Sequence, residues 1–343
     1  MSINKSEAII EECLDRCAGT AIVVTGATGL IGKCIVSKIL SWNACHSNKI
    51  RVYACVRDLE KAHRIFGTEP EELHYIVGDI LELSLEGTEA DYVIHAASNT
   101  ASRAFVETPV EVADEIVNGT GALLRQLKGM KTLKKFVFLS TMEIYGTPPT
   151  DSEIFENTGN NLNTMNVRAC YPIAKRMAEN LCACYASEYG VPFNVARLTQ
   201  TFGKGVQYSD QRVFAEFARC VIEERDIVLS TKGETKRCYI YLEDAVAAIF
   251  RIMTAAESGE AYNVANHATY CSIYEMAQMV AGQLAGHRIS VVIREKENAF
   301  YAPTLHMNLN TEKLQALGWE AGVSLPEMFE ILIEDKKQQR QNG

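Results

Sequence analysis

Short apolar runs alternate with amphipathic stretches along the first two hundred residues. Runs such as "AIVVT" have no polar alternation, which is typical of strands buried on both faces of a parallel sheet. The stretches between them repeat apolar residues at helical spacing. Strands alternating with helices predict an α/β fold with a doubly wound parallel sheet. The expected strands are 21–25, 50–56, 73–78, 91–97, 134–140 and 192–198, and the expected helices include 33–42, 110–128 and 172–189.

A glycine turn, "GATGLIG", follows the first strand directly. Gly26, Gly29 and Gly32 allow a tight turn and let a pyrophosphate approach backbone N–H groups at a helix N-terminus. Three glycines alone are weak evidence, but here they join an apolar strand to an apolar-faced helix. The turn therefore predicts a Rossmann-type dinucleotide site.

The alternation becomes irregular after about residue 200, which predicts a second, smaller lobe. Its expected helices lie near 211–224, 243–255, 272–285 and 324–336, with short strands between them. We expect a helical extension at 1–18, an NAD(P)-binding domain at 19–200 to which 237–265 returns, a smaller substrate-binding lobe at 201–335 and a frayed tail at 336–343. The polar segment 147–167 is long for a loop in a compact domain, which favours a functional role.

Composition narrows the function classes. The chain has 34 Lys and Arg against 43 Asp and Glu, a net charge of −9 without basic blocks, which argues against a nucleic-acid partner. Its apolar runs are too short to span a membrane, and its N-terminus lacks a signal-peptide pattern. Eleven scattered cysteines indicate reduced thiols and a cytoplasmic protein. No His/Cys cluster has zinc spacing, so we expect no metal.

The end of the second strand bears on the choice of cofactor. An acid there binds the ribose hydroxyls of NAD, whereas an arginine accommodates the 2′-phosphate of NADP. This chain has both, Arg57 followed by Asp58, and Arg57 gives a slight preference for NADP. Asp79 follows the third strand and is either an adenine contact or a turn residue.

Seven motifs in fixed order identify a family resemblance. They are "GATGLIG", "VIHAAS" (93–98), "STMEIYG" (140–146), "YPIAK" (171–175), "RLTQTFG" (197–203), "KRCYIYLEDAV" (236–246) and "LGW" (317–319). From about residue 20 to 335 the chain resembles the extended short-chain dehydrogenase/reductases. More narrowly, it resembles the NAD(P)-dependent nucleotide-sugar epimerase/dehydratase family. The resemblance implies an enzyme with tightly bound NADP or NAD, a nucleotide-diphosphate sugar as substrate, and a homodimer formed through parts of 110–128 and 172–189.

The catalytic set follows from the resemblance and from chemistry. Family members oxidise a sugar hydroxyl, which requires a base, and a free tyrosine with a pKa near 10 is a poor one. Lys175 shares a helix face with Tyr171, and its charge together with the helix N-terminus should favour the phenolate. Thr141 matches the residue that hydrogen-bonds the reacting hydroxyl. Glu143 is a candidate general acid or base, or else a residue that orders its loop.

The exact reaction stays open at this point. "HAASNTASRAFVETPVEV" and "VRACYPIAKR" most resemble UDP-glucuronate decarboxylases, whereas "VYACVRDLEK" resembles UDP-N-acetylglucosamine dehydratases that use NADP. Met142 departs from the Thr-Asp-Glu triplet of dTDP-glucose 4,6-dehydratases, and a thioether cannot donate a proton. Decarboxylation therefore ranks above 4,6-dehydration, and 4-epimerisation ranks third. An NADPH-consuming reductase and a catalytically silent dinucleotide-binding regulator are the alternatives.

The resemblance also implies the residues that contact each ligand. Arg212 and Arg237 are expected at the pyrophosphate of the sugar nucleotide, where guanidinium forks bind phosphate in a bidentate manner. The other expected substrate contacts are Thr100 and Gln200. The expected cofactor contacts are Gly26, Thr28, Gly29, Leu30, Ile31, Gly32, Arg57, Asp58, Asp79, Ile80, Ala96, Ala97, Ser98, Asn118, Tyr171, Lys175 and Leu198.

Overall fold

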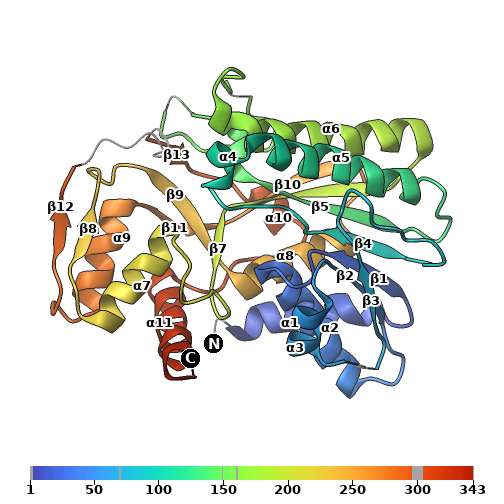
Figure 1. The fold of residues 1–343 in the computed structure, drawn as a ribbon, viewed down its shortest axis with the longest axis horizontal. Coiled ribbons are helices and arrows are strands. Elements are labelled where there is room, and N and C mark those ends of the chain that lie inside the picture. Colours follow the sequence, from blue (N-terminus) through green and yellow to red (C-terminus); the bar gives the residue numbers. More distant parts are fainter. Residues whose placement is uncertain (1–2, 69–70, 149, 160, 296–303, 343) are drawn as a thin grey trace.

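A parallel sheet of seven strands forms the centre of the computed structural model, which describes residues 3–68, 71–148, 150–159, 161–295 and 304–342 (Figure 1). Its strand order is β10-β6-β5-β4-β1-β2-β3. The order reverses between β1 and β4, and such a switch point is where doubly wound sheets bind ligands. The predicted fold class is therefore confirmed. The strands are β1 (Ala21–Thr25), β2 (Arg51–Val56), β3 (Leu73–Val77), β4 (Tyr92–His95), β5 (Lys135–Thr141), β6 (Phe193–Leu198) and β10 (Glu260–Val264).

Helices cover both faces of this sheet (Figure 1). One apolar core lies between the sheet and helices α5 and α6, and a second lies between the opposite face and α1, α2 and α8. Burial on both faces explains why the central strands read as unbroken apolar runs. These helices are α1 (Ile3–Asp15), α2 (Leu30–Cys45), α3 (Leu59–Phe66), α4 (Ala104–Glu107), α5 (Pro109–Leu127), α6 (Cys170–Tyr189) and α8 (Leu242–Ala255).

The helix after the glycine turn starts earlier than predicted. α2 begins at Leu30, three residues before the expected start at 33, so Gly32 lies inside the helix. The N-terminal helix α1 packs on α8, and Arg251 Nη2 lies 2.6 Å from Glu12 Oε2 across that contact. The N-terminal extension is therefore part of the folded layer next to α8.

The remaining elements form the second part of the chain. A four-stranded sheet contains β7, β9, β11 and β13, and β8 pairs with β12. Phe202, Phe214 and Phe329 pack together in the apolar core beside them. The elements are β7 (Gln200–Phe202), α7 (Val213–Glu223), β8 (Ile227–Leu229), β9 (Lys236–Tyr241), β11 (Asn266–Ser272), α9 (Ile273–Met279), a π-helical turn (Val280–Leu284), β12 (Val291–Ile293), β13 (His306–Met307), α10 (Glu312–Gln315) and α11 (Leu325–Asn342).

Residues 237–265 divide between the two parts. Strand β9 joins the four-stranded sheet, whereas α8 and β10 belong to the layer and the edge of the seven-stranded sheet. The domain boundaries proposed from the sequence stay a prediction. None of the helices in the described ranges is long and apolar enough to cross a membrane.

The expectation of a frayed C-terminal tail is wrong for the residues up to 342. Helix α11 continues to Asn342, six residues beyond the predicted end at 336. Lys336 is fully buried, and its Nζ donates to the carbonyl of Gln207 at 2.6 Å. The polar composition of the tail suggested a frayed end. Several of these polar side chains instead bind main-chain groups elsewhere in the fold.

Candidate active site

A cleft of about 250 Å³ opens at the carboxyl ends of the central strands. Its walls come from the glycine turn, the ends of β4, β5 and β6, the start of α6, and Arg212. A second cavity of about 330 Å³ continues from the glycine turn to the end of β2. Together they form a site long enough to bring a dinucleotide and a second ligand together. The predicted residues that line one or both are Gly26, Thr28, Gly29, Leu30, Ile31, Gly32, Arg57, Asp58, Ile80, Ala96, Ala97, Ser98, Thr100, Thr141, Glu143, Tyr171, Lys175, Leu198, Gln200 and Arg212.

The glycine turn leaves no room for a side chain at Gly26 or at Gly32. Gly26 has a φ of 65°, the left-handed region that favours glycine. A Cβ at Gly32 would lie 2.3 Å from the carbonyl oxygen of Gly26, so the turn and α2 must be in backbone contact. Gly29 precedes α2, and no side chain caps that helix end. Free N–H groups at a helix N-terminus suit the pyrophosphate of a dinucleotide.

A buried histidine, His95, contacts the strand end that leads into the glycine turn. It was not predicted from the sequence as a site residue. His95 Nδ1 lies 2.7 Å from Thr25 Oγ1, which accepts a hydrogen bond from Ala97 N, and Nε2 lies 3.2 Å from Thr120 Oγ1. Burial, helped by the charge of Lys175, lowers the pKa of His95 to about 3. The ring is therefore neutral at physiological pH, and it connects β1 and β4 to α5. Its position in "VIHAAS" was the available signal.

The end of β2 presents cations to the second cavity. Arg57 is 71% exposed, and its Nη1 lies 3.9 Å from Asp79 Oδ2. The carboxylate of Asp58 caps α3 by accepting from Lys61 N at 2.9 Å. Asp58 is thus already engaged, while Arg57 and Lys61 line the cavity with Glu115. Neither Lys61 nor Glu115 was predicted from the sequence as a cofactor contact.

Three catalytic candidates meet at the end of β5. Thr141 is the last residue of that strand, and it accepts a hydrogen bond from Glu143 N at 3.2 Å, which starts a 3₁₀ turn (Met142–Tyr145). Tyr171 lies in the first turn of α6, where its ring stacks on Phe105 with centroids 4.3 Å apart. Lys175 Nζ lies 6.0 Å from the centre of the Tyr171 ring. The structure therefore brings the predicted catalytic set together.

The ionisation of this set differs from the expectation. Burial raises the pKa of Tyr171 above its ordinary value, the charge of Glu143 raises it further, and a hydrogen bond with Thr141 opposes them. Burial also lowers the pKa of Lys175 to about 8. Lys175 donates to the carbonyl of Leu139 at 2.8 Å. The prediction overlooked desolvation, which here outweighs the helix N-terminus and the neighbouring cation.

Glu143 has a partner that sequence reasoning did not name. Arg168 Nη1 lies 3.1 Å from Glu143 Oε2, and both side chains are about one fifth exposed. Asn166 positions Arg168 by accepting from its backbone N–H in the 3₁₀ turn (Val167–Ala169) that precedes α6. The guanidinium also lies 5.7 Å from the centre of the Phe105 ring. Glu143, which lines the cleft with Tyr171, is therefore an anion paired with the cation of Arg168.

A buried polar network holds the end of β5 in place. Ser140 Oγ donates to Glu179 Oε1 at 2.5 Å, and Arg197 Nη2 donates to Glu179 Oε2 at 2.7 Å. Arg197 also donates to the hydroxyl of Tyr145, which donates to Asn263. Because Tyr145 ends the 3₁₀ turn that carries Glu143, the network fixes that turn against β6 and α6.

Three predicted ligand contacts do not line either cavity. Asn118 is exposed on α5 and donates to Asp114, whereas Glu115, one turn earlier, lines the cavity; the contact of Asn118 with the cofactor stays a prediction. Asp79 pairs with Arg57 but lines neither cavity itself. Arg237 lies in β9, and its Nε is buried without a hydrogen-bond partner among the described residues. Its contact with substrate stays a prediction.

The described part of the chain holds no group of three His, Cys, Asp or Glu side chains that could bind a metal ion. All eleven cysteines, which lie within the described ranges, are free.

Comparison with known proteins agrees with this fold. UDP-glucuronic acid decarboxylase 6 of Arabidopsis thaliana is 26% identical over 323 residues, covering 92% of this chain and 88% of that protein. The UDP-glucuronic acid 4-epimerase of Bacillus cereus, solved with NAD, superposes with a TM-score of 0.76 at 19% identity, covering 93% of this chain and 99% of that one. The dTDP-glucose 4,6-dehydratase of Bacillus anthracis, also solved with NAD, gives 0.76 at 18% identity, covering 94% and 98%.

The family assignment follows from a match over most of the chain. Residues 22–265 match the model of the NAD dependent epimerase/dehydratase family, a range that includes the glycine turn and the whole catalytic set. The resemblance stated from the motifs is thereby confirmed. The chain belongs to the NAD-dependent epimerase/dehydratase family of enzymes.

Proposed function

We propose that this enzyme decarboxylates UDP-glucuronate through a transient 4-keto sugar. The observation that carries the proposal is that Glu143, which lines the cleft together with Tyr171, is paired with the guanidinium of Arg168. A guanidinium at this place suits a sugar that bears a carboxylate, because arginine binds carboxylates through two parallel hydrogen bonds. The sequence similarity to UDP-glucuronic acid decarboxylase 6 of Arabidopsis thaliana supports the same choice.

The residues divide the reaction between them. A cofactor held by the glycine turn and the residues of the second cavity would supply the hydride acceptor for C4 of the sugar and the hydride donor for its later reduction. For this reaction Tyr171 must act as the phenolate, against the effect of burial on its pKa. It then takes the proton of the C4 hydroxyl, Thr141 hydrogen-bonds that hydroxyl, and Lys175 contributes positive charge beside the Tyr171 ring. The resulting β-keto acid loses carbon dioxide as the electrons of the C5–C6 bond move toward the ketone, and the enolate that forms takes a proton from solvent at C5. When the C4 ketone is reduced again, Tyr171 gives its proton back to the C4 oxygen. Arg168 holds the carboxylate before it leaves.

Met142 distinguishes this reaction from elimination of water. A dehydratase must protonate the departing hydroxyl, and a thioether has no proton to give. Met142 is buried in the wall of the cleft, where its sulfur lies 3.2 Å from Thr199 Oγ1, a hydroxyl that donates to the carbonyl of Cys238 at 2.5 Å. Carbon dioxide needs no such acid, which favours decarboxylation.

For the cofactor we propose NADP over NAD. Arg57 and Lys61 face the cavity at the end of β2, and the Asp58 carboxylate is occupied at the start of α3. Two cations suit a 2′-phosphate, whereas an NAD site requires a free acid. The solved epimerase and dehydratase contain NAD, so NAD is the alternative.

The rival reactions differ in what they release. A 4,6-dehydratase loses water, and a 4-epimerase gives an isomer of unchanged mass. A simple reductase consumes NADPH steadily, and a silent regulator turns over no sugar. The complete set of Thr141, Tyr171 and Lys175 argues against the last of these.

The test is a panel of UDP-, GDP-, CDP- and dTDP-sugars, including the uronic acids, incubated in deuterated water and read by mass spectrometry. Loss of carbon dioxide from UDP-glucuronate is expected, without net consumption of NADP. Loss of water with deuterium at C5 would establish a dehydratase. A mass-neutral product without deuterium would establish a 4-epimerase.

We also propose that the enzyme is a cytoplasmic homodimer. An apolar groove runs along α5 and α6, and Val110, Val167 and Met177 in it are 75%, 58% and 45% exposed. A second copy of the same helix pair would cover these side chains. Light scattering should give twice the mass of the chain. Met177→Asp should give a monomer if the groove is the interface, and an unchanged dimer would contradict that surface.

A further inference from the structure

The loop at residues 203–212, between β7 and α7, is held by side chains of two other elements. Main-chain groups of Gly205, Val206, Gln207, Tyr208 and Asp210 all bind side chains from α7 or α11. Main-chain groups of a surface loop ordinarily bind water. These side-chain bonds to main-chain groups indicate that the fold holds this loop in one position.

Helix α11 holds the first half of the 203–212 loop. Asp335 accepts from Gly205 N at 2.9 Å, Gln339 donates to the carbonyl of Val206 at 3.1 Å, and Lys336 donates to that of Gln207 at 2.6 Å. Lys336 is fully buried, so its charge lies against the loop and away from solvent. Three residues within about one turn of the last helix thus bind three consecutive loop residues.

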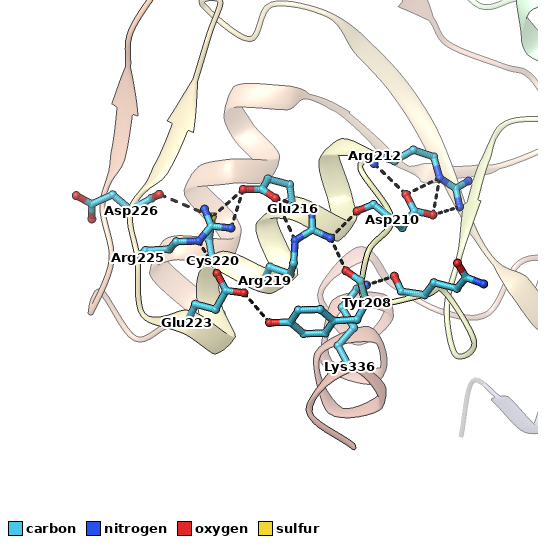
Figure 2. Close-up of polar contacts among 11 residues, drawn as sticks. Tyr208, Asp210, Arg212, Glu216, Arg219, Cys220, Glu223, Arg225, Asp226 and Lys336 are labelled. Carbon is cyan, nitrogen blue, oxygen red and sulfur yellow. Dashed lines mark hydrogen bonds and ion pairs between the residues drawn. The ribbon is translucent and has the colours of Figure 1, made fainter. Parts of the chain in front are cut away.

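Arg219 of α7 holds the second half. Its Nη1 donates to the carbonyl of Tyr208 at 2.6 Å and to that of Asp210 at 2.5 Å. Nη2 donates to Glu216 at 2.5 Å, which fixes the guanidinium from the opposite side. Figure 2 shows Arg219 between Glu216 and the two carbonyl groups, with Lys336 bonded to the same loop.

The 203–212 loop ends at Arg212, the cation in the wall of the cleft. Asp210 accepts from the backbone N and Nε of Arg212, and Nη2 of Arg212 lies 2.6 Å from Asp210 Oδ2. Burial would raise the pKa of Asp210, but the bonds and charge of Arg212 together hold it below its ordinary value. The carboxylate stays ionised and keeps the Arg212 guanidinium at the wall of the cleft.

We propose that Arg219 and α11 are positioning elements of the nucleotide-sugar site, because they fix the 203–212 loop and thereby the guanidinium of Arg212. This rests on the proposed function, in which Arg212 binds the pyrophosphate. Neither element touches the ligand. Loss of a bond to the loop therefore weakens binding of the sugar nucleotide and leaves the second cavity, whose lining includes no residue of the loop, unchanged.

The chain offers a matched control for the test. Arg225 is bonded to the same Glu216 at 2.8 Å and to Glu223 at 2.7 Å, and its hydrogen bonds and ion pairs stay on α7 and outside the loop. Figure 2 shows it at the end of α7 away from Asp210. The pair Arg219→Gln and Arg225→Gln therefore removes the same charge from the same cluster, with and without the contact to the loop.

The first experiment measures binding and kinetics. For Arg219→Gln we expect KM and the calorimetric Kd for UDP-glucuronate to rise about tenfold, the scale of a lost charged hydrogen bond, with kcat and the Kd for NADP within twofold. Arg225→Gln should match the wild type. Lys336→Met, which removes a bond from α11, should act in the same direction as Arg219→Gln and gives a second reading if that variant folds poorly.

The second experiment needs no ligand. Hydrogen exchange of the amides at 203–212 should accelerate in Arg219→Gln and not in Arg225→Gln. Equal exchange in the two variants, or equal loss of affinity, would overturn the inference. If Arg212→Ala weakens UDP-glucuronate binding while Arg219→Gln does not, the positioning role fails and the proposed function stands. If the wild type does not bind UDP-glucuronate, the proposed function fails, and exchange alone decides the role of Arg219.

Discussion

The glycine turn and the 203–212 loop both contribute to the lining of one cleft, but they are held in different ways. The turn is held by its own backbone: residues within one contiguous segment touch so closely that a single methyl group at Gly32 has no space. The loop is held by side chains from residues up to 133 positions further along the chain. The first arrangement is readable from a short motif, and the second is not.

Two buried lysines sharpen the contrast. Lys175 and Lys336 each donate to a main-chain carbonyl, and burial lowers the pKa of each to about 8. Lys175 lies beside Tyr171 and is expected to act in the chemistry. Lys336 lies behind a loop and is expected to act only on its position. Similar burial and bonding thus serve different purposes, which the following predictions separate.

The largest effect is expected at the phenol. Tyr171→Phe removes the oxygen that accepts the proton and keeps the stacking on Phe105, so turnover should fall by roughly 10²- to 10⁴-fold with little change in melting temperature. Tyr189→Phe, on the exposed end of the same helix, is the control and should keep full turnover. Near-normal rates in the first variant would remove Tyr171 from the mechanism.

The next effect concerns the backbone contact in the turn. Gly32→Ala should lower the free energy of unfolding by about 3 kcal/mol, the upper range for an overpacked site, because its Cβ would meet the Gly26 carbonyl at 2.3 Å. Binding of NADP should be lost with it. At Gly129 a Cβ meets nothing within 4 Å, so Gly129→Ala should change neither property. A Gly32→Ala protein that binds NADP normally would show that the turn can shift.

A third effect compares the two lysines through pH. The folded pKa of Lys175 is about 8 and its ordinary value is 10.5, so the unfolded chain binds more protons between those pH values. The free energy of unfolding of the wild type should rise relative to Lys175→Met across that window, by about 3 kcal/mol in total. Below pH 8 both states are protonated and the full penalty of burial is present.

The lysine measurement uses chemical denaturation at several pH values. Lys336→Met should differ from the wild type with the same sign, because burial also lowers its pKa. Lys131→Met, at an exposed position, is the control. Only Lys175→Met should also abolish turnover. A flat difference between wild type and Lys175→Met would mean that this lysine is more hydrated than the structure indicates.

The smallest effect is expected at the adenosine end of the cofactor site. Arg57→Ala should weaken NADP by about 1.5–3 kcal/mol, the scale of a charged hydrogen bond, and leave NAD nearly unchanged. Arg64→Ala, an exposed residue on α3 paired with Glu60, is the control. Calorimetry with both cofactors decides. Equal losses for NADP and NAD would reject a 2′-phosphate site at Arg57.

The sequence by itself determined the features that lie within one segment. The alternation of apolar runs and helices predicted the parallel sheet, because burial on both faces leaves a local signature in composition. The glycine turn and the spacing of Tyr171 and Lys175 were readable for the same reason. Thr141 and Glu143 were placed correctly because parallel strands end at one edge, where the cleft opens.

Only the tertiary structure decided which partners these residues have and how they ionise. Burial raised the pKa of Tyr171, which the nearby lysine was expected to lower, because desolvation depends on the whole surrounding fold. Arg168 met Glu143, and His95 came to lie under the glycine turn. The polar end of α11, expected to fray, binds main-chain carbonyls of the 203–212 loop. A sequence does not show which carbonyl groups lack partners, so it could not reveal those contacts.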